Sequence, residues 1–383
     1  MNVEKIIERK ENPYIRQVVL LVTQSCNLNC KYCYEDFKTS AQMPVTLCQK
    51  ILKKEFCNAI KDPNTQFLAI TFLGGEPLLN FELIKEIAEW LWSKEQTIPY
   101  SLDIRTNGTL MTGDVKKWFA ANKHKISAAL SLDGLNENQK NNRTDKEIDY
   151  KFFIKNWPES RVKIVLFKNS LEDFADTIKE MLAENIPLEV DVGFGFEWTT
   201  EDAIIFEQQL ESLMDVYIDD LREGRISGIF PFSPEHFFKE VPTSYPFCSR
   251  KNNIVSYDID GTPYKCHMFT PVVLSKEKAA WINQHDSEFF NVPVDPFCKD
   301  CPIFHVCKPC PAQNLKICGN IYDSANARTF CKMIKVQARA CAELFLRHIQ
   351  LMMDKNISIQ QEEIEIANKA IRLLKTIPQA KYL

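Results

Sequence analysis

Short apolar runs alternate with longer amphipathic segments between residue 17 and about residue 222. The apolar runs are rich in β-branched residues, which is typical of buried strands, and the segments between them repeat apolar residues at helical spacing. The predicted strands are 17–23, 67–73, 100–106, 126–132, 161–167 and 188–195, and the predicted helices are 45–60, 81–93, 114–122, 171–185 and 201–221. After the fourth strand, the polar segment 136–146 predicts no clear helix.

Six such alternations predict a parallel sheet with right-handed crossovers. A closed eight-fold barrel would need two more strand–helix units, so we expect an α/β fold with an open, partial (β/α)6 barrel of the TIM type. In full barrels, the chemistry takes place at the C-terminal ends of the strands. The chain has only 11 glycines, and six of them lie just past or inside a short apolar run: Gly74, Gly75, Gly108, Gly134, Gly193 and Gly195. Glycine there permits positive φ or close approach of the backbone to a ligand.

The rest of the chain has a different character. Segment 223–246 is rich in Pro and Phe and is predicted to be a linker after the barrel of 17–222, which itself follows an N-terminal extension, 1–16. Nine of the 14 cysteines lie within 247–341, among many turn residues, which predicts a small domain held together by metal. Residues 342–383 are predicted to form a helical tail.

Charge and hydropathy exclude several classes of protein. The net charge is −4 and basic residues are mixed with acidic ones, so nothing predicts a nucleic-acid partner. No run of 18 apolar residues predicts a membrane span, and the charged start of the chain lacks the apolar core of a secretory signal. We therefore predict a cytoplasmic protein, in which clustered cysteines favour metal ligation over disulfides.

The first cysteine cluster follows the first predicted strand. Cys26, Cys30 and Cys33 have the spacing C-x3-C-x2-C. Three thiolates can hold three irons of a [4Fe–4S] cluster and leave the fourth iron open to a cofactor or substrate. The alternatives are a zinc site, which usually needs four ligands in paired knuckles, and an incidental cysteine-rich loop.

This triplet, with the aromatic Tyr32 before its third cysteine, resembles the hallmark of the radical S-adenosylmethionine (SAM) superfamily. The resemblance implies that the open iron chelates the amino and carboxylate groups of SAM. It also implies that reductive cleavage of SAM yields a 5′-deoxyadenosyl radical that removes hydrogen from a substrate. Such chemistry belongs to the cofactor, and the protein aims and shields it.

Further strand-end motifs agree with this resemblance. Leu73–Pro77 resembles the family's GGE motif, so Gly74, Gly75 and Glu76 are expected to receive the amino group of SAM, for which a carboxylate and free carbonyls are suited. Asn107, Ser131 and Asp133 end the next two strands, at positions where relatives contact the ribose and carboxylate. Arg143 follows where relatives place an arginine on the carboxylate. Each position alone is more typical of a turn or surface residue, but together at consecutive strand ends they favour a cofactor site.

The second cysteine group resembles a SPASM domain, the cysteine-rich extension of peptide-modifying radical enzymes. It departs from the family pattern because Cys307 and Cys310 are separated by two residues instead of three. The resemblance implies two auxiliary [4Fe–4S] clusters, hence three clusters in all. One would use Cys248, Cys266, Cys310 and, as the best fourth ligand, Cys318, and the other Cys298, Cys301, Cys307 and Cys331. The alternative is a pair of zinc knuckles.

Other cysteines and aromatic residues are expected to be structural. Cys48, Cys57 and Cys341 lie in predicted helices. Phe194, Phe196 and Trp198 follow the sixth strand, where core or wall packing is expected more than a specific role in a substrate pocket.

The resemblance implies action on a precursor peptide, with electrons from an external donor of the flavodoxin or ferredoxin type. We predict that the enzyme matures a ribosomally made peptide by an intramolecular C–C or thioether cross-link. Formylglycine formation of the anaerobic sulfatase maturase kind, and peptide epimerisation, are the alternatives. Anaerobic sulfatase maturases place an aspartate directly after the cysteine that corresponds to Cys266. This chain has His267 there, and we predict that His267 is a general base.

Two further hypotheses concern the partners and the class of protein. Only 25 residues precede Cys26, whereas many peptide maturases begin with a leader-binding domain, so a separate leader-binding protein is a possible partner. A protein of another class, either an electron carrier or a zinc-stapled binding protein, is the alternative to an enzyme.

Overall fold

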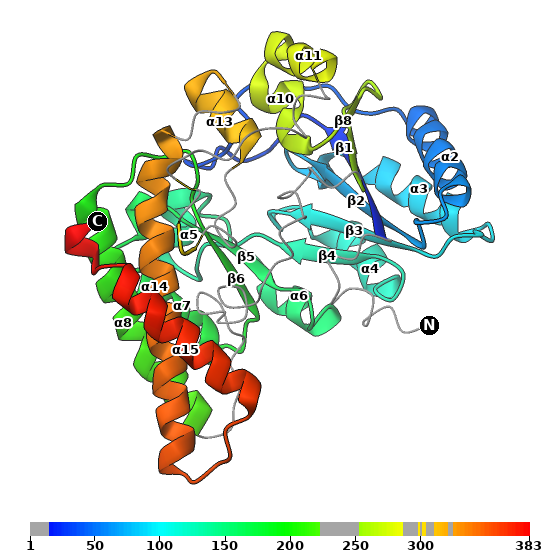
Figure 1. The fold of residues 1–383 in the computed structure, drawn as a ribbon. Helices are drawn as coiled ribbons and strands as arrows, with labels where there is room; N and C mark the ends of the chain where they lie inside the picture. Colours follow the sequence, from blue (N-terminus) through cyan, green and yellow to red (C-terminus); the bar gives the residue numbers. More distant parts are fainter. Residues whose placement is uncertain (1–14, 223–252, 286–297, 299–300, 304–309, 321–324) are drawn as a thin grey trace.

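The computed structural model describes residues 15–222, 253–285, 298, 301–303, 310–320 and 325–383 (Figure 1). Its main sheet has the order β4-β3-β2-β1-β7-β8, and β5 and β6 form a second, two-stranded sheet. The strands are β1 Ile15–Thr23, β2 Phe67–Gly74, β3 Tyr100–Thr106, β4 Ser127–Leu130, β5 Val162–Leu166, β6 Leu188–Val192, β7 Ile254–Tyr257 and β8 Pro263–Tyr264. All neighbouring pairs are parallel except β7 and β8.

The helices fill the crossovers much as predicted. Those of the barrel are α2 Val45–Lys61, η1 Pro77–Asn80, α3 Phe81–Trp92, α4 Gly113–Ala121, α5 Glu137–Asn142, α6 Tyr150–Asn156, η2 Lys168–Ser170, α7 Phe174–Ala183 and α8 Thr200–Arg222. The later ones are η4 His267–Phe269, α10 Pro271–Leu274, α11 Lys276–Gln284, α13 Pro311–Cys318, α14 Ala325–Asp354, α15 Gln361–Thr376 and η6 Ala380–Tyr382. The polar stretch 136–146, where no clear helix was predicted, forms the short helix α5, and a second short helix, α6, follows it.

Successive side chains of each strand point to opposite faces of the sheet, one toward the helices and the other toward the interior of the barrel. Leu20, Ile70 and Ile104 are fully buried and belong to one core that the surrounding helices share. Between such positions the side chains are more open, as at Asp103 and the exposed Arg105. The α/β prediction is thus confirmed, with apolar residues under the helices and polar residues facing inward.

The prediction was incomplete at two edges of the sheet. β4 and β5 are joined only by an isolated bridge between Ser131 and Lys163, so the six predicted barrel strands lie in two sheets. The free edge of β1 is covered by β7, which comes from the cysteine-rich region. The side-chain amide of Asn253 donates to the carbonyl of Ile15 at 2.9 Å and helps to hold this edge. Such pairing depends on residues far apart in sequence.

The predicted domain edge at residue 341 lies inside α14, which runs without a break through residues 325–354. α14 packs against α8 of the barrel and against α15, and Figure 1 shows the three helices beside one another. Cys341 is fully buried there, as is Cys48 in α2, whereas Cys57 is exposed. No helix in the described part of the chain is both long and apolar enough to cross a membrane.

Candidate active site

The loop that carries the first three cysteines leaves the C-terminal end of β1 and is held from two sides. The amide of Cys33 donates to the carbonyl of Cys30 at 3.1 Å, and the amide of Leu28 donates to the sulfur of Cys26 at 3.4 Å. The amide of Lys31 donates to the carbonyl of Asn142 at 3.0 Å, which ties the loop to α5. The backbone therefore fixes where the thiols lie.

Two glycines let the end of β2 pack directly against this loop. A Cβ atom on Gly74 would lie 2.2 Å from the carbonyl oxygen of Thr23. One on Gly75 would lie 2.3 Å from the carbonyl oxygen of Ser25 and 2.9 Å from the Cβ of Cys26. Because real Cβ atoms essentially never come so close, only glycine fits these two positions.

The thiols are partly buried, which disfavours their charged form. Burial raises the pKa of Cys26 to about 11, against the opposing effect of the Leu28 amide. Burial also raises the pKa of Cys30, against the opposing charge of Arg143. Thiols of this kind ionise when a metal centre binds them.

The donor set suits a cluster better than a single ion. In the described ranges, no group of three His, Cys, Asp or Glu side chains is arranged to hold one metal ion. A mononuclear site needs its ligands about 2.3 Å from one centre, whereas an iron–sulfur cluster takes thiolates on separate irons. Three thiols on one anchored loop therefore fit a cluster with one open iron.

Beside the loop, the carboxylate of Glu76 connects β2 to β3. It accepts from the hydroxyl of Thr106 at 2.7 Å, the amide of Asn107 at 2.8 Å and the amide of Leu78 at 3.1 Å. Burial raises its pKa to about 7, against these hydrogen bonds. Glu76 therefore joins two strand ends as well as lying where a cofactor ammonium was predicted.

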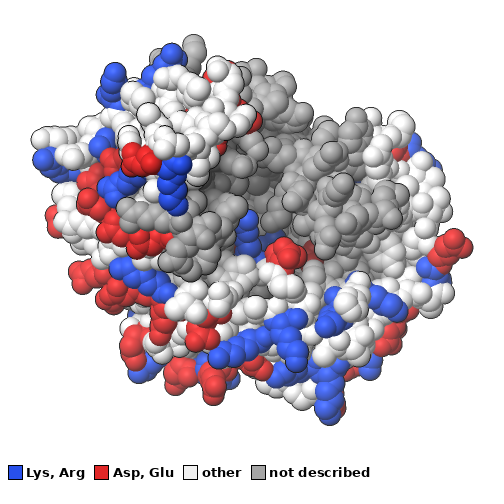
Figure 2. All heavy atoms as spheres, turned by 90° about the horizontal axis from the view of Figure 1, so that it is seen from below, with Lys and Arg blue, Asp and Glu red and all other residues white. Residues whose placement is uncertain are grey.

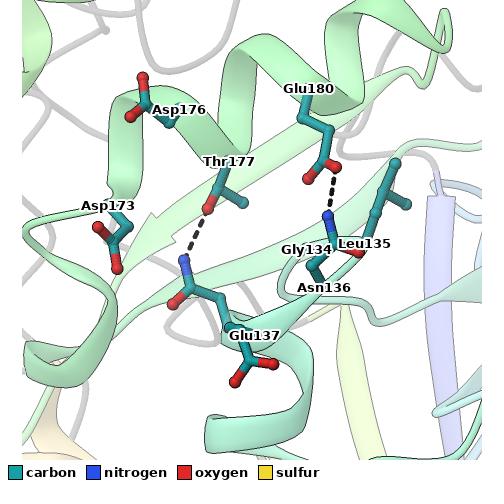
Figure 3. A pocket seen from close by; sticks show the side chains of 9 residues that line it. Gly134, Leu135, Asn136, Glu137, Asp173, Asp176, Thr177 and Glu180 are labelled. Atoms are coloured by element: carbon teal, nitrogen blue, oxygen red, sulfur yellow. Dashed lines mark hydrogen bonds between the residues drawn. The ribbon is translucent and has the colours of Figure 1, made fainter.

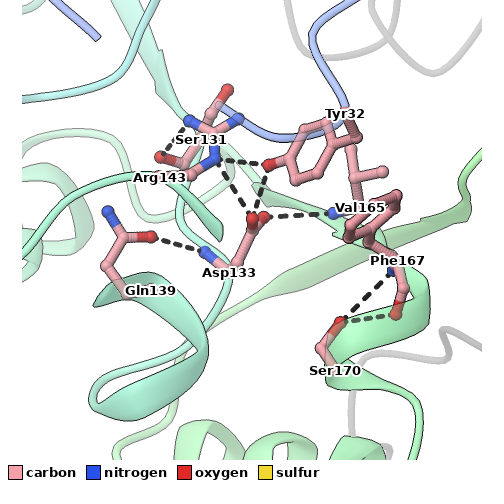
Figure 4. A network of polar contacts seen from close by, with 8 residues as sticks. All are labelled: Tyr32, Ser131, Asp133, Gln139, Arg143, Val165, Phe167 and Ser170. Atoms are coloured by element: carbon pink, nitrogen blue, oxygen red, sulfur yellow. Dashed lines mark hydrogen bonds and ion pairs between the residues drawn. The ribbon is translucent and has the colours of Figure 1, made fainter. Parts of the chain in front are cut away.

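A buried network surrounds Arg143 (Figure 4). Its Nε donates to the hydroxyl of Tyr32 at 2.5 Å and lies 3.3 Å from Asp133, while one terminal nitrogen donates to the carbonyl of Ser131 at 3.2 Å. The Tyr32 hydroxyl donates to Asp133 at 2.5 Å, and the other oxygen of Asp133 accepts from the Val165 amide at 3.3 Å. Both carboxylate oxygens of Asp133 thus have protein partners.

This network reaches the cysteine loop. Tyr32 is part of that loop, and the Arg143 guanidinium is close enough to Cys30 to influence its pKa. Asn142, next to Arg143, buries a side-chain amide whose two polar atoms have no hydrogen-bond partner within the described residues. Since buried polar groups are nearly always paired, this region suits a polar ligand.

Asn107 lies in a second set of contacts with the same loop. Its side-chain amide donates to Asn27 at 3.0 Å, and Asn27 in turn donates to the hydroxyl of Thr109 at 2.7 Å. The structure thus brings every predicted cofactor residue to the strand ends around the cysteine loop. Asn27 and Thr109 were missed, although Asn27 lies between the first two cysteines of the motif and could have been suspected.

His267 lies on the other side of the loop, beside Tyr34, with ring centroids 5.9 Å apart. Burial, and then the charge of Arg105, lower the pKa of His267 to about 4. The imidazole is therefore neutral at neutral pH. Its Nδ1 is 3.7 Å from the sulfur of Cys266.

The auxiliary cysteines are only partly described. Cys248 and Cys307 lie outside the described residues. Cys301 and Cys331 are close enough for their charges to interact, and the amide of Cys301 donates to the carbonyl of Cys298 at 3.2 Å. Cys266 and Cys310 pack against one apolar cluster. Cys310 and Cys318 mark the two ends of α13, about 12 Å apart along the helix axis at 1.5 Å per residue.

The aromatic residues past β6 pack as predicted. Trp198 is buried and donates to the carbonyl of Gly193 at 2.9 Å. Phe196 packs on Phe167, with ring centroids 4.8 Å apart, and Phe194 packs on Phe330 at 4.7 Å. None of these contacts assigns them a ligand.

A hollow of about 420 Å³ lies outside the barrel, between the loop after β4 and α7 (Figure 3). Acidic side chains line it, including Asp173 and Asp176, and Asn138 donates across it to Thr177 at 2.6 Å. It is separate from the cysteine loop. On the face in Figure 2, basic and acidic side chains are intermixed.

The part of the chain that carries this site resembles known iron–sulfur proteins in sequence. Residues 15–146 match the family model of the 4Fe–4S single cluster domain. Over 287 residues the chain is 24% identical to the radical SAM cyclopropyl synthase TigE of Paramaledivibacter caminithermalis. The chain is thus similar in sequence to radical SAM enzymes. The match with TigE covers 66% of this chain and 57% of TigE, so this chain spans less than two thirds of that relative.

Solved structures show that the radical SAM resemblance extends to the fold. The structure of anSMEcpe with bound AdoMet matches with a TM-score of 0.63 and 18% identity, covering 93% of this chain and 98% of that one. Streptococcus suis SuiB bound to precursor peptide SuiA matches with a TM-score of 0.52 and 17% identity, covering 82% and 76%. The predicted fold class is therefore confirmed. The matches with the 4Fe–4S family model and with TigE support the predicted radical SAM resemblance, and the roles of individual residues stay predictions.

Proposed function

We propose that this radical SAM enzyme matures a ribosomally made peptide by forming an intramolecular C–C or thioether cross-link. The observation that carries the proposal is the anchored loop of Cys26, Cys30 and Cys33 at the end of β1, with the Arg143 network beside it. When bound there, the cluster and SAM supply a 5′-deoxyadenosyl radical that removes hydrogen from the peptide. The remaining steps depend on the chain's own residues.

Arg143 is suited to hold the carboxylate of SAM. Its guanidinium is 10% exposed, and Asp133, at 1%, fixes its orientation from behind. The Tyr32 ring lies under it, 5.5 Å from the guanidinium carbon. Asp133 and Tyr32, both predicted to bind the cofactor, would on this geometry act by positioning Arg143.

Glu76 and Asn107 are suited to hold the other end of SAM. Glu76 accepts three protein donors, and a carboxylate has about four acceptor sites, so one remains for an N–H of the SAM amino group. The close packing at Gly74 and Gly75 leaves their backbone beside the cysteine loop. Asn107, tied to Asn27 of that loop, is within reach of a ribose held in the same place.

The proposed substrate class rests on the interior of the barrel and on the docked cysteine-rich region. Charged side chains alternate with the apolar core on the strands, including Arg105 and the pair of Lys163 and Asp191 at 2.5 Å. Gln24, just before the loop, donates to Asp258 of the β7–β8 hairpin at 2.9 Å. SuiB, which shares the fold, was solved with a precursor peptide.

Two auxiliary clusters on the later cysteines would accept the electron left after bond formation. A cross-link removes two hydrogens from the peptide: one leaves with the 5′-deoxyadenosyl group, and the other leaves as a proton and an electron. His267 is the predicted general base for that proton, but burial and the charge of Arg105 lower its pKa to about 4 and so make it a weak base. An external donor of the flavodoxin or ferredoxin type would supply the first electron.

Co-expression with short peptides encoded beside the gene tests the proposal, with peptide mass as the readout. A loss of two hydrogens per event supports cross-linking. An aldehyde formed from cysteine or serine would instead indicate formylglycine formation, and deuterium uptake without a change of mass in normal water would indicate epimerisation. The Cys30→Ala variant is the control and should leave every peptide unmodified.

A further inference from the structure

Lys38 is a basic residue that the predicted machinery does not use. Its ammonium lies 3.0 Å from the sulfur of Cys33, five residues earlier in the same loop. It is also close enough to interact electrostatically with Cys26 and Cys30. A single ammonium group therefore contacts one predicted iron ligand and acts electrostatically on the other two.

The position of Lys38 is unlike that of an ordinary surface lysine. Its side chain is partly buried. Next to it in the loop is Glu35, a buried carboxyl with 8% exposure whose charge also interacts with Lys38. Arg143 is the other cation near the thiols, but it is engaged by Asp133 and Tyr32. Lys38 thus differs from Arg143 in directing its ammonium at a cysteine sulfur.

Hydrogen bonds to cysteine sulfurs and nearby charge set the reduction potential of iron–sulfur clusters. Reduction adds one negative charge, and a cation a few ångströms away stabilises the reduced form more than the oxidised form. We propose that Lys38 raises the reduction potential of the cluster on Cys26, Cys30 and Cys33. One electron enters from the external donor, no bond forms or breaks, and the lysine keeps its proton.

This inference rests on the proposed cluster. Experiments on the whole chain with reconstituted iron and sulfide test the presence of the cluster and the effect of Lys38 separately. Iron content and the electron paramagnetic resonance signal that responds to SAM establish the cluster in the wild type. Redox titration of that signal then compares K38M, which removes the charge, with K38R, which retains it. K31M is the matched control, because Lys31 is exposed, lies in the same loop and carries the same charge.

We expect K38M to lower the equilibrium constant for one-electron reduction about tenfold, which is about 59 mV for one electron. K38R and K31M should stay close to the wild type. An unchanged potential in K38M, or an equal shift in K31M, would overturn the proposal. If K38M failed to load iron, K38Q and K38R would decide, because both can donate an N–H but only K38R is charged. Equal potentials in that pair would overturn the role of charge, while a wild type without iron would instead refute the proposed function.

Discussion

The buried pair of Asp133 and Arg143 gives the sharpest prediction about the cofactor site. The two side chains are 1% and 10% exposed, and their closest atoms are 3.3 Å apart. The D133N substitution keeps the shape but removes the charge, so that Arg143 is left as a buried cation facing only neutral partners. Breaking a buried pair in this way typically costs about 3–5 kcal/mol of unfolding free energy.

Chemical denaturation of D133N, R143M and the double variant measures this coupling. D133N should lose about 3–5 kcal/mol, and D133N/R143M should lose less than D133N alone, because no unpaired charge remains. Added SAM should restore part of the stability of D133N if its carboxylate replaces the missing one. A loss within about 0.5 kcal/mol for D133N, the range of ordinary surface substitutions, would refute the buried-pair reasoning.

Three other variants test separate parts of the account. G75A should lose the catalytic cluster, measured as iron content, because its Cβ would lie 2.3 Å from a backbone oxygen. G113A also strains a residue of positive φ, but nothing lies within 4 Å of its Cβ, so it should keep the cluster. The affinity for SAM, measured anaerobically by calorimetry, should rise as pH increases through about 7, because burial raises the pKa of Glu76 to about 7 and the ionised carboxylate is the better acceptor for an N–H of the SAM amino group. E76Q should remove that dependence, and its persistence in E76Q would exclude Glu76 as the source. C331A should reduce the iron content from about 12 to about 8 atoms per chain. C341A, which changes a fully buried thiol of the same helix, should leave the iron content unchanged. Equal iron contents in the two variants would contradict an auxiliary cluster on Cys331.

The strands of the barrel could be predicted because their periodicity is local. Predicted strand 100–106 coincides with β3, and predicted strand 67–73 is extended by one residue in β2. Strand β7 could not be predicted, since it is short and its partner β1 lies more than 200 residues earlier. Whether this segment forms a strand depends on which edge of the sheet is free to pair with it, and no local sequence pattern contains that information.

The candidate site likewise has features that the sequence could predict and features that it could not. The cysteine triplet and Gly74–Gly75 have fixed spacing, so the sequence alone indicated where they would gather. The partners of each side chain were not predictable: Glu76 is occupied by three donors, two from the end of β3 and one from η1, and Asp133 by Tyr32 and Val165. Lys38 was missed because a single lysine in a polar loop has no signature until its distance to a sulfur is known.

Formation of 5′-deoxyadenosine tests the central claim most directly. The reconstituted wild-type protein is incubated anaerobically with SAM and a strong reductant, and the product is measured by chromatography and mass. The account predicts 5′-deoxyadenosine from the wild type and none from C30A, with K31M matching the wild type. No product from an iron-loaded wild type, or equal product from C30A, would contradict a catalytic cluster on Cys26, Cys30 and Cys33.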